Sequence, residues 1–222
     1  KYCTIFICKL EISMTSTAQV QPTVTGNIRH QIAKFNRGRV FSIDTIKVES
    51  SSRQTIQRSL SRLAEEGLIN RIQNGIYYKP VISKILNGKQ MPPDIDETIK
   101  IITAKNKEKI QLHGAAAANR LGLSTQMPMY KVFHTNGITR EIEIAGTKVY
   151  FAHTNNAKLL QYSGTNVGLA ISAMYYLGKN IVNERVIYPV KSRLTEREFN
   201  QLREAELVSW MQKGLRTAEE YA

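Results

Sequence analysis

Apolar residues recur every three or four positions, the spacing of one helix face, in two segments of the first third of the chain. These segments are residues 27–36 and 52–66, and the recurring positions are Ile28, Ile32 and Phe35 in the first and Ile56, Leu60 and Leu63 in the second. A shorter helix is predicted over 42–48, because Ser42 can cap its first turn and Asp44 suits the positive end of its dipole. Ser52 is a suitable N-cap for the helix over 52–66, and Gly67 is a suitable stop.

Directly after Gly67, two short β-prone runs flank an Asn-Gly dipeptide. The runs are residues 68–71 and 76–79, and Asn74-Gly75 between them is a strong signal for a tight hairpin turn. Three helices closed by a β-hairpin predict a winged helix-turn-helix over residues 24–80. In that arrangement the helix over 52–66 would enter a major groove of DNA, and the hairpin would lie on the neighbouring backbone.

The polar side of the helix over 52–66 carries side chains that suit DNA. Arginine and glutamine can form paired hydrogen bonds with base edges, whereas serine, threonine and the arginine of the hairpin suit phosphate oxygens. The alternative interpretation is that Arg58 and Arg62 only solvate an exposed helix face. The predicted DNA-binding residues are Ser52, Arg53, Gln54, Thr55, Gln57, Arg58, Ser61 and Arg62 of the helix and Arg71, Gln73 and Asn74 of the hairpin.

The charge of the chain favours an anionic partner. Its 222 residues carry a formal net charge of +13, and the simplest anionic partner for such a protein is nucleic acid. Residues 14–80 hold ten Lys and Arg against four Asp and Glu, whereas residues 81–222 hold nineteen against thirteen. Because the first third is the more basic per residue, double-stranded DNA is expected to bind there.

The rest of the chain predicts further helices and strands. Residues 81–93 have weak periodicity and end in Pro92-Pro93, so they are expected to be a linker. Beyond them a helix is predicted to begin at Asp94 or Asp96. A later helix is predicted over 195–207, where Thr195 and Glu198 form a capping-box pattern. Helices are also predicted over 115–121, over 167–177 and around Trp210, and strands over 109–112, 129–134, 139–145 and 148–153.

The strand predicted over 139–145 alternates between isoleucines and polar residues, which indicates a sheet with one wet face. With turns at Asn136-Gly137 and Ala145-Gly146, the last three strands are expected to form a meander. The predicted fold is therefore α+β, with a winged helix-turn-helix domain over 24–80, a linker over 81–93 and a mixed α+β domain with a mainly antiparallel sheet over 94–222.

The sequence offers no strong catalytic or metal-binding motif. Its four histidines lack metal-ligand spacing, and residues 164–168 lack the lysine of a phosphate-binding loop. Glu141 and Glu143 could hold Mg²⁺ together from one strand, but such a pair is more often a solvated sheet face. The chain is therefore expected not to be an enzyme and to use no cofactor, no metal ion and no catalytic residue.

Both cysteines, Cys3 and Cys8, precede Met14, and the cysteine-free remainder fits a reducing cytoplasm. Residues 1–23 are expected to be a disordered or non-native extension. No apolar run reaches the ~18 residues that a membrane span needs, so no membrane association is expected.

Four stretches resemble a known family. They read GLINRIQNGIYYKP, HGAAAANRLGLSTQMP, HTNGITREIEIAG and GLAISAMYYLGK in chain order. Through them, residues 24–190 resemble the AbiEi-type antitoxins of bacterial abortive-infection systems, which are type IV toxin–antitoxin systems. The resemblance implies a winged helix that binds inverted repeats in its own promoter and represses the operon. It also implies a C-terminal domain that counteracts a nucleotidyltransferase toxin, without a stable complex being required.

Two other functions are also compatible with the sequence. One is a winged-helix transcriptional repressor whose C-terminal domain senses a small molecule or dimerises. The other is a DNA-processing enzyme that uses Glu141 and Glu143 with a metal ion.

Overall fold

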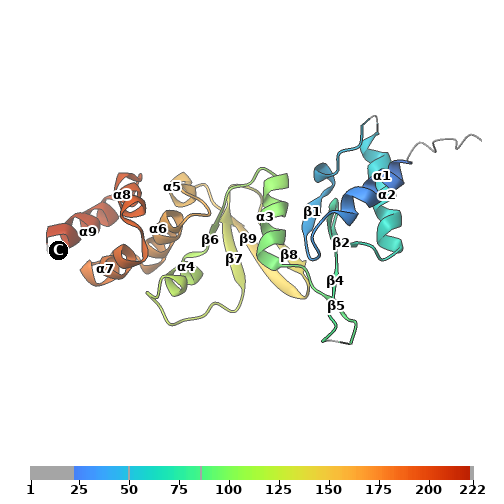
Figure 1. The fold of residues 1–222 in the computed structure, drawn as a ribbon. Coiled ribbons are helices and arrows are strands. Elements are labelled where there is room, and N and C mark those ends of the chain that lie inside the picture. Colours follow the sequence, from blue (N-terminus) through green and yellow to red (C-terminus); the bar gives the residue numbers. More distant parts are fainter. Residues whose placement is uncertain (1–22, 50, 86, 221–222) are drawn as a thin grey trace, which may run out of the picture.

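The structure is a computed structural model that describes residues 23–49, 51–85 and 87–220, so the expectations for residues 1–22 fall outside it. The fold is mixed α+β, as the sequence predicts. Three groups of elements lie in a row in Figure 1. A three-stranded sheet with two helices is at one end, a four-stranded sheet is in the middle, and a cluster of helices is at the other end.

The first group contains α1, α2 and an antiparallel sheet in the order β1-β3-β2. α1 begins before the predicted residue 27, because Thr23 caps it by accepting a hydrogen bond from the Gly26 N–H at 3.2 Å. α2 begins where predicted, and the Ser52 hydroxyl accepts from the Thr55 N–H at 3.2 Å. The elements are α1 (Val24–Ala33), β1 (Val40–Ser42), the 3-10 turn η1 (Ile43–Thr45), α2 (Arg53–Glu65), β2 (Asn70–Gln73) and β3 (Ile76–Tyr78).

The helix predicted over 42–48 is confined to the single turn η1. Ser42 caps this turn as expected, since its hydroxyl accepts from the Asp44 N–H at 3.2 Å. The Gln31 side-chain amide then binds both the carbonyl of Lys47 at 2.7 Å and its N–H at 3.3 Å. The Gln31 side chain of α1 thus binds the N–H and carbonyl of Lys47, which a longer helix would need for its own hydrogen bonds. The chain is already extended at Ile46.

Residues 81–93, expected to be a linker, contain an antiparallel hairpin of β4 (Val81–Ile82) and β5 (Gln90–Met91). Its turn includes Asn87-Gly88, with φ of 50° and 78°. Paired positive φ values are typical of tight hairpin turns, in which Asn-Gly is favoured. The same dipeptide that predicts the β2–β3 turn therefore also forms this one, between strands too short to show alternation.

The middle group is a four-stranded sheet in the order β6-β7-β9-β8. The predicted meander is wrong, because β9 lies between β7 and β8 and pairs with β7 in parallel. Val149 and Phe151 of β9 are fully buried, whereas β8 has polar residues on one face and suits an edge. The elements are α3 (Ile95–Lys105), β6 (Ile110–Leu112), α4 (Gly114–Arg120), β7 (Lys131–Thr135), β8 (Arg140–Ile144) and β9 (Thr147–His153).

The last group is a cluster of helices around α6, which α4 also packs against. The capping box of Thr195 and Glu198 is present at α8, as predicted, whereas α5 and α7 were not predicted. None of the helices in the described ranges has the length and apolar character needed to cross a membrane. The elements are α5 (Ala157–Leu160), α6 (Asn166–Leu177), α7 (Glu184–Arg193), α8 (Glu196–Glu204) and α9 (Ser209–Glu220).

A shared hydrophobic core joins the first two groups. α3 lies between the three-stranded and the four-stranded sheets in Figure 1, and it buries side chains with both. The buried members of this core are Val40, Ile76 and Tyr78 of the small sheet, Ile99 and Ile102 of α3, and Phe133, Ile144, Val149 and Phe151 of the larger sheet. The small sheet is therefore packed against the middle of the molecule, with apolar surface buried on both sides of the junction.

Candidate nucleic-acid interface

α2 is divided into a buried side and an exposed side. Ile56, Leu60 and Leu63 pack into the hydrophobic core that α2 shares with α1 and the small sheet. The buried Ser59 hydroxyl lies 3.0 Å from that of Thr25 on α1. The helix is therefore held in a fixed rotation against α1. Its opposite side faces outward, as the periodicity predicts.

The outward side of α2 forms a shallow, open depression. Arg58 and Arg62 are exposed, and neither guanidinium group has an ion pair or hydrogen bond within the described ranges. Two guanidinium groups that are free to bind phosphate or guanine therefore lie one helical turn apart. Glu65, at the C-terminal end, is the acidic member of this surface. The depression is lined by Gln54, Gln57, Arg58, Ser61, Arg62 and Glu65.

The first turn of α2 is arranged differently. Ser52 and Thr55 are exposed, and their hydroxyls lie 2.9 Å apart at the start of the helix. Arg53 is also exposed, but it donates to Asp44 of η1 at 2.5 Å. Asp44 therefore neutralises one of the predicted DNA-binding cations, so Arg53 is a weaker phosphate ligand than Arg58 or Arg62.

The hairpin residues lie together but apart from the α2 depression. Arg71 is exposed and donates to the side chain of Asn74, while Gln73 is half-buried. Lys105 of α3 donates to the Asn74 carbonyl at 2.7 Å, so the β2–β3 turn is braced by the middle of the molecule. Arg71 lines a separate groove of about 710 Å³ between the end of α2, β2 and β5, together with Ala64 and Gln90.

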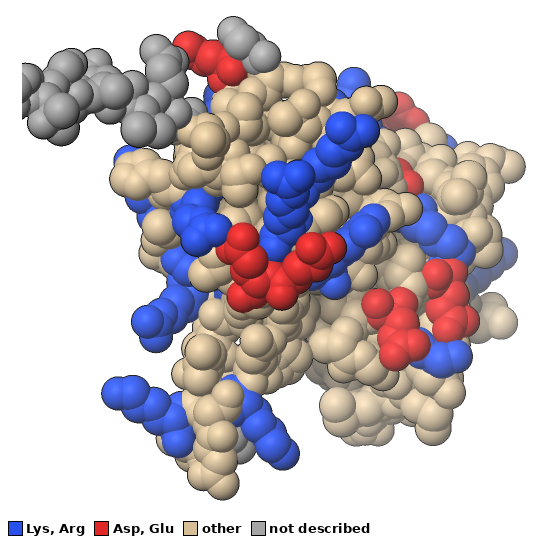
Figure 2. All heavy atoms as spheres, turned by 90° about the vertical axis from the view of Figure 1, so that its right-hand side faces the viewer, with Lys and Arg blue, Asp and Glu red and all other residues tan. Residues whose placement is uncertain are grey.

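Lysines of the β4–β5 hairpin are the basic residues that the sequence reasoning missed. Figure 2 looks at the end of the molecule that holds α1 and α2. Lys and Arg side chains are spread over this face beside a group of acidic ones, and more of them flank the hairpin that protrudes at the bottom. Lys84 and Lys89 are exposed on this hairpin. The Asn87-Gly88 turn signal between them could have identified it.

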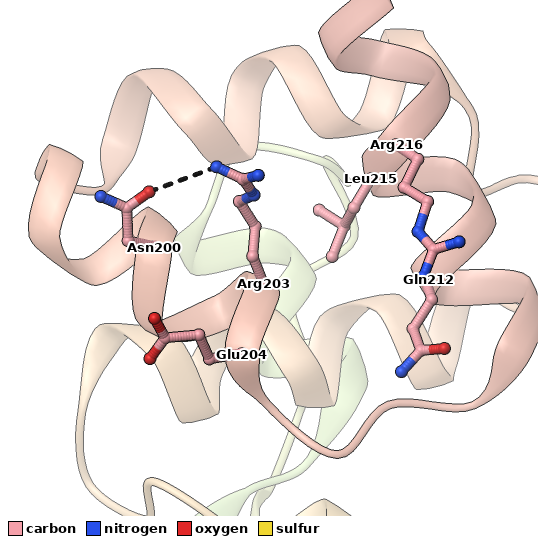
Figure 3. Close-up of a pocket in the computed structure, with 6 residues that line it drawn as sticks. All are labelled: Asn200, Arg203, Glu204, Gln212, Leu215 and Arg216. Atoms are coloured by element: carbon pink, nitrogen blue, oxygen red, sulfur yellow. Dashed lines mark hydrogen bonds between the residues drawn. The ribbon is translucent and has the colours of Figure 1, made fainter.

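Two further hollows lie away from this face. One, of about 430 Å³, is a cleft between α8 and α9 lined mainly by polar side chains, among them Arg203, Glu204 and Arg216 (Figure 3). The other, of about 470 Å³, lies between α3, β6 and the start of α6, with Lys100 and Arg120 at its rim. Neither brings together a nucleophile and a base in the manner of an enzyme site.

The two acids proposed as metal ligands lie on the exposed face of β8. Glu141 accepts from Lys148 at 2.9 Å, and this hydrogen bond raises the pKa of Lys148. In the part of the chain that the structure describes, no three His, Cys, Asp or Glu residues converge on one point. The Glu141–Glu143 pair thus has the geometry of a solvated sheet face rather than of a completed Mg²⁺ site.

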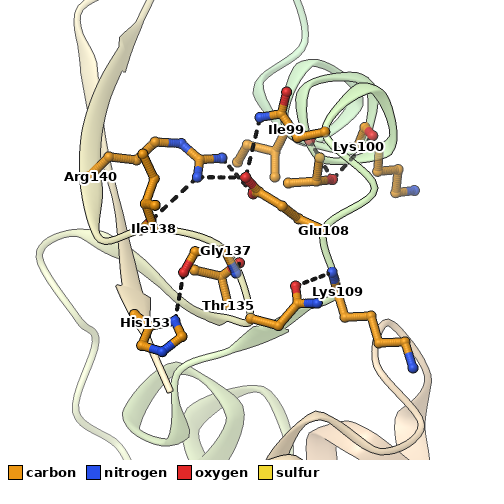
Figure 4. A network of polar contacts seen from close by, with 12 residues as sticks. Ile99, Lys100, Glu108, Lys109, Thr135, Gly137, Ile138, Arg140 and His153 are labelled. Carbon is orange, nitrogen blue, oxygen red and sulfur yellow. Dashed lines mark hydrogen bonds and ion pairs between the residues drawn. The ribbon is translucent and has the colours of Figure 1, made fainter. Parts of the chain in front are cut away.

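A largely buried polar network supports the middle sheet (Figure 4). Glu108, after α3, accepts two hydrogen bonds from Arg140 of β8, at 2.8 and 2.6 Å. The Arg140 guanidinium also lies 4.5 Å from the centre of the Phe151 ring. A Cβ on Gly137 would lie 2.7 Å from the Glu108 carboxyl group, so a larger residue there would displace this side chain. The Glu108–Arg140 pair at the centre of the network ties the edge strand β8 to the segment after α3.

A pair of histidines lies where β7 meets α4. The rings of His113 and His134 are 4.9 Å apart, and His113 caps α4 by accepting from the Ala115 N–H at 3.4 Å. Burial lowers the pKa of both imidazoles, and the neighbouring His113 lowers that of His134 further. The fold therefore favours two neutral rings.

The sequence profile of a family of unknown function, DUF6088, matches residues 27–202. The matched region begins in α1, includes both hairpins and the middle sheet, and ends within α8. No curated protein matches the chain.

Proposed function

The chain belongs to this DUF6088 family, and we propose that it is a double-stranded DNA-binding repressor of its own operon and a type IV antitoxin. The DNA-binding part of the proposal is carried by one observation. The outward side of α2 presents Arg58 and Arg62 without acidic partners in the described ranges, between polar side chains that can bind base edges.

Residues 24–80 are proposed to be a winged helix-turn-helix. The order of elements supports this interpretation, since α2 packs on α1 and leads directly into the β2–β3 hairpin. β1 joins the hairpin through β3, which gives the small sheet its order β1-β3-β2. In this proposal α2 enters the major groove at operator inverted repeats, and Arg71 lies near the backbone.

The antitoxin part rests on the resemblance of residues 24–190 to AbiEi-type antitoxins. In this proposal the region after residue 93 counteracts a nucleotidyltransferase toxin in the cytoplasm, with or without a stable complex. Because the small sheet and α3 share a core, the full chain is the appropriate form for testing both activities.

The experiment is a salt titration of binding to the promoter DNA of the chain's own operon. Replacing both Arg58 and Arg62 with Ala should weaken binding and reduce the log–log salt slope by about 0.9 for each phosphate that the protein no longer neutralises. The matched control replaces Lys213 and Arg216, two exposed cations of α9 at the opposite end of the molecule. The control removes the same amount of charge as the α2 variant. Because its two cations lie far from α2, it should leave most of the affinity for DNA intact.

Equal losses of affinity in the two variants would mean that net charge, and not α2, determines binding.

Rescue from a co-expressed toxin of the nucleotidyltransferase type tests the second activity. The Arg58→Ala, Arg62→Ala double variant should still rescue growth, because α2 lies at the far end of the molecule from α6 to α9. Failure of the unaltered chain to rescue would contradict the antitoxin proposal alone.

One observation favours a second function, a repressor that senses a small molecule. The cavity between α3, β6 and α6 combines apolar walls with two cations, Lys100 and Arg120, and two carboxylates, Asp96 and Glu108, and α3 also packs against the small sheet. In this alternative, a small polar molecule bound there alters DNA affinity through α3. A metabolite that changes the salt titration of the unaltered chain, but not that of Lys100→Ala, would support this alternative.

A further inference from the structure

The β4–β5 hairpin projects from the molecule as a positively charged arm. Its Lys84 and Lys89 are exposed, and residues 81–93 contain no Asp or Glu. Figure 1 places the hairpin below the small sheet, beyond the outline of both sheets. Since a protruding cationic element gains little from packing, its charge is available to an anionic partner.

The arm is fixed at its base and closed at its turn. The Asn70 side-chain amide of β2 donates to Gln90 of β5 at 2.5 Å and to the Tyr78 hydroxyl at 3.0 Å. Near the turn, the Ser83 N–H donates to the Lys89 carbonyl at 3.0 Å. The hairpin that carries the two lysines is thus joined to β2, the strand that also carries Arg71.

The β2–β3 turn cannot project in the same way. Its Asn74 carbonyl is bound by Lys105, and that lysine lies against Gly75. The turn of the first hairpin therefore faces α3, while the second hairpin extends past it (Figure 1). The second hairpin is the one that protrudes at the bottom of the face that holds α1 and α2 (Figure 2).

The hairpin also exposes apolar side chains near its lysines. Ile85 is 92% exposed and Ile82 is 59% exposed. An exposed isoleucine flanked by cations suits a DNA minor groove, where apolar side chains wedge at base steps and lysines bind the phosphates on either side. A purely apolar protein partner would leave both ammonium groups without a counter-charge.

We propose that the β4–β5 hairpin is a second DNA-binding arm, which lies in the minor groove beside the site bound by α2. Lys84 and Lys89 bind phosphates on its two walls, and Ile85 contacts the floor of the groove. This inference rests on the proposed DNA binding and adds a DNA-binding element outside the winged-helix region. Arg71 and Gln90 line one groove together with Ala64 at the end of α2, and Glu143 of β8 is the acidic residue of this groove.

The experiment compares the unaltered chain with full-length variants on promoter DNA by salt titration and hydroxyl-radical footprinting. The double variant Lys84→Ala, Lys89→Ala should reduce the salt slope by up to about 1.8, at 0.9 per phosphate. Its footprint should lose minor-groove protection on one flank and keep the protection that depends on Arg58 and Arg62. Lys84→Arg with Lys89→Arg keeps the charges and should restore both the slope and the footprint.

Three outcomes would overturn the inference. The Lys→Ala variant could keep the full salt slope and footprint while the Arg58→Ala, Arg62→Ala variant loses binding. In that case the β4–β5 hairpin does not bind DNA, and the proposed function stands. If the unaltered chain does not bind DNA, both proposals fail. If Ile85→Ser changes the sedimentation coefficient of the DNA-free protein but not its footprint, the hairpin joins two copies of the chain instead.

Discussion

α2 and α6 are helices of thirteen and twelve residues that use their surfaces in opposite ways. α2 buries one side and leaves its arginines and glutamines in solvent. α6 buries every residue from Val167 to Met174, because α4 and α8 pack around it. A helix such as α2 can change its outward residues at little cost in stability, whereas substitutions in the buried part of α6 would disturb the core.

The largest expected effect comes from the close approach of α4 to α6. A Cβ on Gly114 would lie 2.2 Å from the Tyr176 Cβ and 2.6 Å from the Ser172 carbonyl. Gly114→Ala should lower the free energy of unfolding by about 3 kcal/mol, although alanine is normally the better helix former. Urea denaturation of the two proteins measures the difference.

Gly214→Ala in α9 is the matched control for this substitution. A Cβ there would meet Val182 at an ordinary 3.5 Å, so alanine should stabilise the protein by up to about 1 kcal/mol. Losses of stability of similar size in both variants would contradict the assignment of the Gly114→Ala effect to the close packing of α4 on α6.

The next effect tests the Glu108–Arg140 pair of the middle sheet. The two side chains are only 9% and 17% exposed, so Glu108→Gln leaves a mostly buried guanidinium without its counter-charge. The free energy of unfolding should fall by about 2 kcal/mol, since the amide keeps one hydrogen bond.

The corresponding change at the α2 end is Asp44→Asn, which removes the partner of Arg53 in an exposed pair. It should cost less than about 1 kcal/mol, because water solvates both groups there. Parallel denaturant titrations of the two variants would sharpen the comparison between the middle sheet and the α2 end of the molecule. Equal losses of stability in the two variants would contradict the expected difference.

The smallest effect is a dependence of stability on pH. The pKa values of His113 and His134 are lowered in the folded chain, so below the ordinary value of 6.5 the unfolded chain binds more protons. The free energy of unfolding should therefore fall as the pH drops below 6.5, and the fall should end once the folded pKa values are passed. His134→Gln should reduce this dependence, whereas replacing the exposed His30 should not; thermal melts from pH 7.5 to 5 would measure it.

Local signals in the sequence predict much of the first group of elements. Ser52, Gly67 and Asn74-Gly75 act within a few residues of themselves, so the start of α2, its end and the following turn were predictable. The exposed side of α2 followed from the same periodicity. The predicted DNA contacts themselves stay predictions.

Interactions between distant residues explain what the sequence did not predict. Gln31 stops the helix after η1, and Lys105 braces the β2–β3 turn, yet both act from other elements. β9 lies between β7 and β8 and pairs with β7 in parallel, an order that the spacing of residues along the chain did not reveal. The β4–β5 strands are too short for a periodic pattern, although their Asn-Gly turn was visible.

The core that Ile99 and Ile102 share with Val40 and Tyr78 also affects how the molecule would evolve. A gene fusion or truncation at residue 93 would leave unmatched apolar surfaces on both products. The basic end and the helical end are consequently expected to be inherited as one unit, with compensating changes on the two sides of α3.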